Sequence, residues 1–202
     1  MNSINTHTLF TLHNILSYCI LFMIFTYAYI KNKNNIGYEE IICNLINWTL
    51  IFSPCILLYK FNQFELVFGE FGCLIDLLGW YVTLDTYFYF MHRWFHKNKW
   101  IFNNIHFLHH TGIPQTIFDA QYSHPLETII ITIPSYWMYI FFKIYIFKKF
   151  NFIAFVIINV SSIYYNLTSH IYDGFHLTHH YKPTHNFGIS YYYDKLYNTF
   201  SN

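Results

Sequence analysis

The sequence predicts an all-α membrane protein, a polytopic helical bundle built from about four to five apolar segments. Hydrophobic residues make up 54% of the 202 residues and charged residues only 10%, whereas a soluble domain carries about 25% charged residues. The apolar residues also occur in long blocks, which is the pattern of membrane-spanning helices. A compact soluble domain with an unusually apolar surface is the alternative, and the block pattern argues against it.

Three apolar blocks precede the first histidine motif. Residues 9–30 contain neither acid nor base, are long enough to span a bilayer, and lack the basic start and small-residue cleavage site of a signal peptide. Residues 41–59 form a second uncharged block. The third block, residues 71–91, contains Asp76 and Asp85. Because a charge inside a span is unfavourable, we expect these acids to be paired or functional.

Two further apolar blocks separate two histidine-rich regions. Residues 129–142 are apolar but short for a span, and residues 150–168 are uncharged. If both histidine regions share one site, these blocks either cross the membrane twice or form a shallow re-entrant hairpin. Counting back places Lys31 and Lys33 on the histidine face, which the positive-inside rule assigns to the cytoplasm. The crossing topology places the three lysines of residues 143–149 on the far side, which favours the re-entrant hairpin, so both topologies stay open.

Histidines are concentrated in the second half of the chain. Of the 13 histidines, 11 lie between His92 and His185, in an HxxxH pair at residues 92–96 and two HxxHH triplets at residues 106–110 and 176–180. One such triplet is expected about 0.05 times by chance in a chain of this composition. Histidines three and four positions apart project from one side of a helix, so each motif can present several ring nitrogens to a metal at once.

The number and type of these side chains predict two metal ions. Neutral imidazole suits iron, copper, zinc and nickel, whereas magnesium and calcium prefer oxygen ligands. The three motifs supply eight rings, more than the four ligands of one tetrahedral ion. The four cysteines lie inside apolar blocks, which argues against an iron–sulfur cluster, and a haem would use one or two histidines. The predicted ligands are these eight and His170, which follows an apolar block directly: His92, His96, His106, His109, His110, His170, His176, His179 and His180.

Acidic residues near the motifs are candidates to orient the histidine rings. Asp85 precedes His92 by seven residues, two helical turns on the same face, and we expect it to accept the free N–H of a ligating histidine. An ion pair with a neighbouring span is the alternative for Asp85. Glu127 and Asp194 invite the same interpretation with less force. Four histidines stand outside the motifs with no assigned role: His7, His13, His124 and His185.

These motifs, in this order, resemble the fatty acid hydroxylase / sterol desaturase superfamily of membrane-bound, histidine-rich di-iron enzymes. The resemblance covers residues 85–199 and includes the HxxxH and HxxHH motifs and an HPxE-like segment at residues 124–127. It ends with Asn186-Phe-Gly and with residues 194–199, where Asn198 replaces the usual glycine. We therefore expect a single membrane domain, residues 1–202, with a fatty acid hydroxylase-like catalytic region at residues 85–199.

The resemblance implies two iron ions, O2 as co-substrate, and electrons that come ultimately from NAD(P)H through a separate donor, a cytochrome b5-like protein or a reductase. It implies hydroxylation of a C–H bond of a membrane lipid, a sterol or a fatty acyl chain, or desaturation by the same site. It further implies an integral membrane protein, of the endoplasmic reticulum if eukaryotic, with its histidines facing the cytoplasm.

Two other classes of protein use the same residue types. A zinc-dependent membrane hydrolase normally holds one metal and needs a general base. A metal transporter or metal-binding membrane protein would carry its histidines and acids within several spans, whereas here they cluster at span ends. Nucleic acid is not an expected partner, because the net charge is +1 without a basic run.

Overall fold

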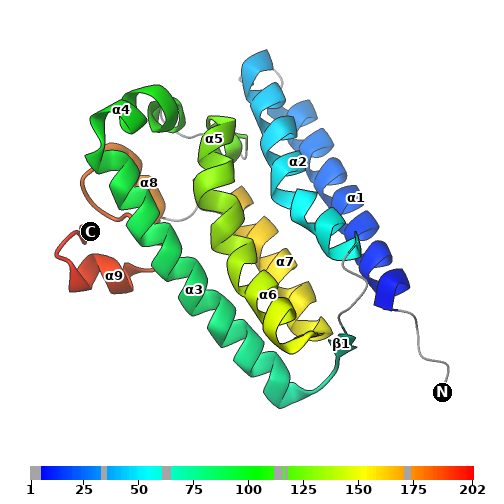
Figure 1. Ribbon diagram of the computed structural model, residues 1–202. Helices are drawn as coiled ribbons and strands as arrows, with labels where there is room; N and C mark the ends of the chain where they lie inside the picture. The colour runs from blue at the N-terminus through cyan, green and yellow to red at the C-terminus, as the bar shows by residue number, and fades with distance from the viewer. Residues whose placement is uncertain (1–5, 33–35, 61–64, 112–115, 117, 171–173) are drawn as a thin grey trace.

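The computed structural model describes residues 6–32, 36–60, 65–111, 116, 118–170 and 174–202. Long helices run side by side through these residues, with the short elements α4, α5 and α8 gathered near one end of the bundle (Figure 1). A two-stranded ribbon lies at the opposite end (Figure 1). The helical part of the predicted fold class is thus confirmed.

Each long helix follows an apolar block of the sequence. Helices α1 and α2 form a hairpin on one side of the bundle (Figure 1). Helix α3 then runs the length of the molecule and carries the first histidine pair near its end. Four long helices match the apolar blocks at residues 9–30, 41–59, 71–91 and 150–168. In that order they are α1 (Thr6–Asn32), α2 (Tyr38–Lys60), α3 (Glu70–Lys97) and α7 (Phe152–Thr168).

The segment expected at residues 129–142 is longer than predicted. Helix α5 (Pro125–Glu127), the π turn η4 (Thr128–Thr132) and α6 (Ile133–Phe147) together form an uninterrupted helical stretch, Pro125–Phe147, of 23 residues. At about 1.5 Å per residue it is roughly 34 Å long, enough to cross a bilayer. Among the described residues, this is the one helix that meets both the length and the apolarity of a span, with a mean hydropathy of 1.5.

Helices α3 and α6 pack against each other most closely. A Cβ at Gly79 would lie 2.4 Å from the ring of Tyr139, so a larger residue here would displace the end of that side chain. The core between α3, α6 and α7 contains the buried side chains of Trp80, Trp137 and Phe155. Burial of these large aromatic side chains stabilises the packing of the three helices against one another.

A buried polar cluster joins the helices at the end of the bundle away from the histidines. Asp76 is 2% exposed, and its carboxylate lies 2.8 Å from Lys143 Nζ. It also accepts hydrogen bonds from the Tyr139 hydroxyl and the Asn151 amide. The prediction that a charge inside the third apolar block is paired is confirmed for Asp76.

Strands β1 (Glu65–Val67) and β2 (Lys149–Asn151) pair in parallel beside this cluster. Lys149 of β2 faces Glu65 of β1 at 3.5 Å. Two of the three lysines that argued for a re-entrant hairpin therefore face carboxylates, which weakens that argument.

Candidate metal centre

All nine histidines predicted as ligands lie together at one end of the bundle, in two groups. In each group, the atoms able to bind a metal lie within 4.8 Å of one another. The five-histidine group consists of His92, His96, His106, His110 and His179. The four-histidine group consists of His109, His170, His176 and His180.

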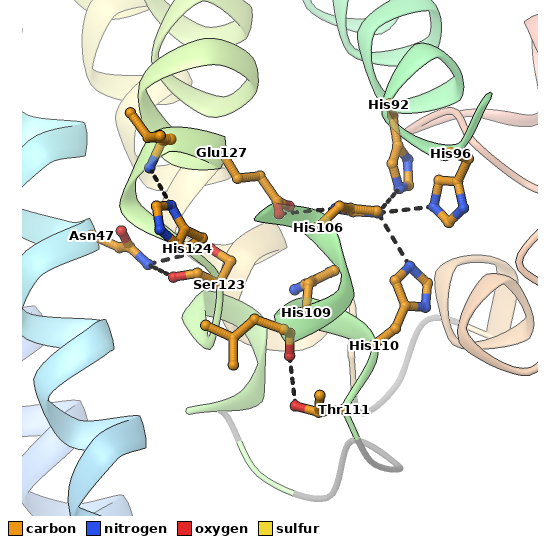
Figure 2. A network of polar contacts seen from close by, with 12 residues as sticks. Asn47, His92, His96, His106, His109, His110, Thr111, Ser123, His124 and Glu127 are labelled. Atoms are coloured by element: carbon orange, nitrogen blue, oxygen red, sulfur yellow. Dashed lines mark hydrogen bonds and ion pairs between the residues drawn. The ribbon is translucent and has the colours of Figure 1, made fainter. Parts of the chain in front are cut away.

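Ring nitrogens face one another in the five-histidine group. The Nε2 atom of His106 lies 2.8 Å from that of His96 and 3.2 Å from those of His92 and His110 (Figure 2). The Nε2 atom of His179 lies 3.0 Å from that of His96. With metal–nitrogen bonds of about 2.1 Å, two ligands at a right angle lie about 3.0 Å apart, and two tetrahedral ligands about 3.4 Å. The spacing is therefore that of ligands around one metal ion.

The four-histidine group is built in the same way. The Nε2 atom of His170 lies 3.2 Å from those of His109 and His176. Both ring nitrogens of His180 are buried and have no hydrogen-bond partner in the part of the chain that the structure describes. A buried polar atom without a partner is unfavourable, and a cation at the centre of the group would supply one.

Hydrogen bonds on the far side of the rings determine which nitrogen carries the proton. The Nδ1–H of His92 donates to the carbonyl of Phe187 at 2.8 Å, and that of His179 to the carbonyl of His185 at 2.6 Å. Because a carbonyl can only accept, the proton is on Nδ1 and the Nε2 atom of each ring presents a lone pair. Lone pairs that point at one another require a proton or a metal ion between them.

Glu127 orients the central ring of the five-histidine group. Its carboxylate lies 2.9 Å from Nδ1 of His106 (Figure 2), the carboxylate–histidine arrangement common around metals. Glu127 is 8% exposed and begins the long helix Pro125–Phe147. Its position three residues after His124 is the sequence signal for this residue, and as a candidate to orient a histidine ring that signal is weaker than the one for Asp85.

Each HxxHH triplet presents two ring nitrogens to one group, as expected of such a motif, and the third ring to the other group. In residues 106–110, the first and last histidines belong to the five-histidine group and His109 to the other. In residues 176–180, the first and last belong to the four-histidine group and His179 to the other. Neighbouring residues on a helix point about 100° apart, so the two adjacent histidines of a triplet diverge and reach different positions.

Changes in helix type place the second motif. Asn98 ends α3 and caps α4 (Lys99–Ile101) by accepting from the amides of Trp100 and Ile101. The chain continues through a π turn, η1 (Phe102–His106), into a 3-10 turn, η2 (Phe107–His110). π turns recur at functional sites because they rotate side chains away from the α-helical register.

The third motif lies on its own short helix. Helix α8 (Gly174–Tyr181) carries His176, His179 and His180, and His170 follows the end of α7 directly. The structure thus places His170 beside the histidines of the motifs, as the sequence predicts.

Burial keeps these imidazoles neutral. It lowers the pKa of His110 to about 3, with a further contribution from His92 and His170 nearby. It likewise lowers the pKa of His180 to about 3, assisted by His110 and His92. Both rings are therefore neutral at pH 7, which is the form that binds a metal.

Asp85 does not bond a histidine ring in the described structure, and this expectation was wrong. Its carboxylate accepts from the amides of Ile189 and Ser190 and from the Ser190 hydroxyl, at 3.2, 3.0 and 2.6 Å. Asp85 does lie on the same face of α3 as His92, two turns away, but its carboxylate binds the backbone of Ile189 and Ser190 instead. Asp85 therefore positions His92 through the segment 187–190, because Phe187 accepts the His92 hydrogen bond.

Asp194 holds the same segment from its other side. It is fully buried and accepts from the amides of Phe187 and Gly188 and from the Thr199 hydroxyl, at 2.9, 2.8 and 2.6 Å. Its backbone lies in the short helix α9 (Tyr191–Leu196). The two carboxylates together fix the Phe187 carbonyl, which accepts the hydrogen bond from His92 Nδ1–H. Sequence patterns carry no signal for such a backbone acceptor.

The histidines outside the motifs do not join either group. His124 caps α5, where its Nδ1 accepts from the Leu126 amide at 3.2 Å. The ring of His185 contacts the Thr184 hydroxyl at 2.9 Å. The side chains of His7 and His13 lie outside the described residues.

A cavity of about 350 Å³ opens beside the five-histidine group. Its walls include His96 and Phe187 together with the cations Arg93 and Lys97. The Arg93 guanidinium donates to the Tyr89 hydroxyl and lies over the ring of Tyr197. The cavity therefore connects one ring of the group to a positively charged surface.

The sequence pattern of the fatty acid hydroxylase family matches residues 77–199. This covers more than half of the chain and includes every histidine of both groups. The chain therefore belongs to the fatty acid hydroxylase family.

Curated relatives match shorter segments. The chain is 42% identical over 50 residues to sphinganine C4-monooxygenase 1 of Arabidopsis thaliana, which is 25% of this chain and 19% of that protein. It is 38% identical over 69 residues to a very-long-chain aldehyde decarbonylase of Oryza sativa subsp. indica, 34% of this chain and 25% of that protein. It is 41% identical over 58 residues to methylsterol monooxygenase 1 of Rattus norvegicus, 29% of this chain and 20% of that protein.

The matched segments thus span between about a fifth and a quarter of these relatives. No solved structure matches the chain.

Proposed function

We propose that the chain is an integral membrane di-iron oxygenase that uses O2 and external electrons to hydroxylate a C–H bond of a lipid. One observation carries the proposal: a chain of the fatty acid hydroxylase family brings nine imidazoles into two adjoining groups of five and four. The nine histidines are the proposed metal ligands, and Asp85 is proposed as a residue that positions His92 indirectly.

The donor set fits iron better than a single zinc ion. Five nitrogens in one group exceed the four ligands of a tetrahedral site, and imidazole is a suitable ligand for iron. Iron bound at both groups would supply the O2-activating chemistry that no amino acid side chain provides.

The contribution of the protein is to hold the rings and to exclude water. Hydrogen bonds to the carbonyls of Phe187 and His185 keep the Nε2 lone pairs of His92 and His179 directed inward, and the Glu127 carboxylate lies 2.9 Å from Nδ1 of His106. The rings of His92, His106 and His179 are at most 2% exposed. A dry, preorganised centre protects a reactive step from solvent.

A lipid substrate would reach this centre from the membrane. The proposal places the long helices as spans and the histidine end at the cytoplasmic face, in the endoplasmic reticulum if the protein is eukaryotic. Exposed Lys97 and Lys99 lie at that end of α3 and in α4, which the positive-inside rule supports. The same cations offer a docking face for an acidic electron donor, a cytochrome b5-like protein or a reductase.

The substrate we propose is a sterol or a fatty acyl chain. The names of the relatives include a methylsterol and a sphinganine monooxygenase and a very-long-chain aldehyde decarbonylase. All three names refer to lipids with long apolar portions, and they support a lipid without choosing among them.

The test is metal content and O2 chemistry on one detergent-purified sample. We expect about two irons per chain and an oxygenated product when the reduced protein meets O2 and a panel of sterols and acyl lipids. An alkene product would show that the reaction is desaturation and not hydroxylation. One zinc per chain, without O2 uptake after iron reconstitution, would contradict the proposal and favour a hydrolase.

A pair of variants controls this experiment. His179→Ala removes a ligand of the five-histidine group, and we expect iron content and product to fall together. His185→Ala changes a ring that lies outside both groups and keeps the backbone carbonyl that orients His179, so it should retain both.

A further inference from the structure

We infer that the two metal positions bind iron with unequal affinity, the five-histidine position filling first and the four-histidine position holding the weaker ion. The inference rests on the proposed function and adds the order in which the two positions bind iron and the order in which they lose it. It is carried by differences between the groups in hydrogen bonding, charge and number of donors.

The five-histidine group is fixed from outside by hydrogen bonds at two of its five rings. His92 and His179 donate to backbone carbonyls at 2.8 and 2.6 Å, and these bonds set the orientation and tautomer of both rings before a metal binds, so less ordering remains to oppose binding. At a third ring, the Glu127 carboxylate lies 2.9 Å from Nδ1 of His106 as an ion-pair contact without hydrogen-bond geometry.

The four-histidine group has fewer such contacts in the described part of the chain. His170 faces the hydroxyl of Ser169 at 3.0 Å. The Nδ1 atoms of His109 and His176, and both ring nitrogens of His180, are buried with no hydrogen-bond partner there, whereas in the five-histidine group Nδ1 of His106 alone is in that state. Loss of one outer contact typically lowers metal affinity 10- to 100-fold.

Charge separates the groups in the same direction. Among the described residues, the Glu127 carboxylate is the acid in direct contact with a ring of either group. A negative charge close to a buried cation is strongly favourable where the effective dielectric constant is low. The four-histidine position would hold its cation with neutral rings.

The experiment is an anaerobic Fe²⁺ titration of the purified full-length protein in detergent, at equilibrium against a chelator of known affinity. We expect two binding constants that differ by at least tenfold. Equilibrium constants are needed because His96 lines a surface cavity, so release rates depend on access as well as on affinity.

Two variants that change no ligand assign the constants. Glu127→Gln should lower the tighter constant 10- to 100-fold and leave the weaker one unchanged. Ser169→Ala, the matched change beside the other group, should lower the weaker constant alone. Mössbauer spectra with ⁵⁷Fe should show one iron signal at one equivalent and a second signal at two.

Two equal constants, or a Glu127→Gln variant that weakens only the looser step, would overturn the inference. If Glu127→Gln does not fold, His180→Ala decides the question, because it must remove the weaker step and preserve the tighter one. Failure of the wild-type protein to bind iron at all would overturn the proposed function and the inference with it. Binding of two irons with equal affinity would overturn the inference alone.

Discussion

Asp194 shows how much one buried carboxylate contributes at the scale of a residue. It accepts three hydrogen bonds from the segment that orients His92. Asp194→Ala leaves two amides and a hydroxyl without this acceptor, and each buried unsatisfied group costs about 1–3 kcal/mol. We expect a loss of about 3 kcal/mol in the free energy of unfolding, measured by denaturation of the metal-free protein in detergent.

The neighbouring exposed residue provides the control. Lys195→Ala in the same helix should change the free energy of unfolding by at most about 1 kcal/mol, because the ammonium group that it removes lies over the rings of Tyr191 and Phe200 at an exposed site. Equal stability of Asp194→Ala and wild type would show that water replaces the carboxylate, and the described network would then carry little energy.

Gly188 packs closely beside the same carboxylate, and Gly174 offers a matched control in open space. A Cβ at Gly188 would lie 2.5 Å from the Ser190 carbonyl oxygen and 3.0 Å from Asp194 Oδ2. Gly188→Ala should therefore destabilise the protein by about 1–3 kcal/mol, as overpacking does. Gly174→Ala, where no atom of the described residues lies within 4 Å of the added Cβ, should be neutral or slightly stabilising. Thermal denaturation of both variants measures the contrast, and similar melting temperatures would contradict it.

Residue identities could be predicted from the sequence better than residue partners. The nine clustered histidines stand out because their spacing is improbable by chance. The choice of Asp85 over Glu127 as the acid beside a ring was wrong, because spacing along one helix cannot show which segment lies in between. The contacts of His92 and His179 with carbonyl groups depend entirely on the folded backbone.

At the scale of elements, the ion pair between α3 and α6 is the clearest test of how the bundle is held. Lys143 is partly exposed, whereas Asp76 is nearly fully buried. Lys143→Met leaves that carboxylate with the Tyr139 and Asn151 bonds alone. Removing one partner of a buried pair costs about 3–5 kcal/mol, and partial exposure of Lys143 favours the lower end. Chemical denaturation in detergent should show a loss of about 3 kcal/mol.

A second substitution separates charge from packing. Asp76→Asn combined with Lys143→Met should recover part of the loss, because no uncompensated buried charge remains. Lys149→Ala, which removes the exposed pair with Glu65, should change stability by at most about 1 kcal/mol. An equal loss in the single and double variants would show that packing of the lysine stem dominates.

Element boundaries could be predicted only where charge marks them. The helix Pro125–Phe147 was placed at residues 129–142, because a search for uncharged runs stops at Glu127 and Lys143. Its start carries another signal, the N-cap His124 followed by Pro125 at the first turn. The division of each triplet between the two histidine groups depends on the π and 3-10 turns of residues 102–110 and on where helix α8 lies beside them, and histidine spacing alone does not reveal either.

At the scale of the whole molecule, the length of Pro125–Phe147 favours crossing over a re-entrant hairpin. Lys99 and Lys149 are exposed at opposite ends of the bundle. In a background without the four native cysteines, Lys99→Cys should react with an impermeant maleimide from the cytoplasmic side of sealed vesicles. Lys149→Cys should react only after the vesicles are permeabilised. Reaction of both cysteines from the same side would establish the re-entrant topology.

The division of the triplets has a consequence for the newly made chain. The ring set His92, His96, His106 and His110 leaves the ribosome about 70 residues before His179, which is several seconds at roughly 5–20 residues per second. Four imidazoles in one nascent segment already satisfy a tetrahedral zinc ion. Three of the four rings in the other group follow His110 by about 60 to 70 residues. If both groups bind iron as proposed, correct metallation must wait for His170 and the last triplet, and the nascent chain is vulnerable to capture of the wrong ion until they arrive.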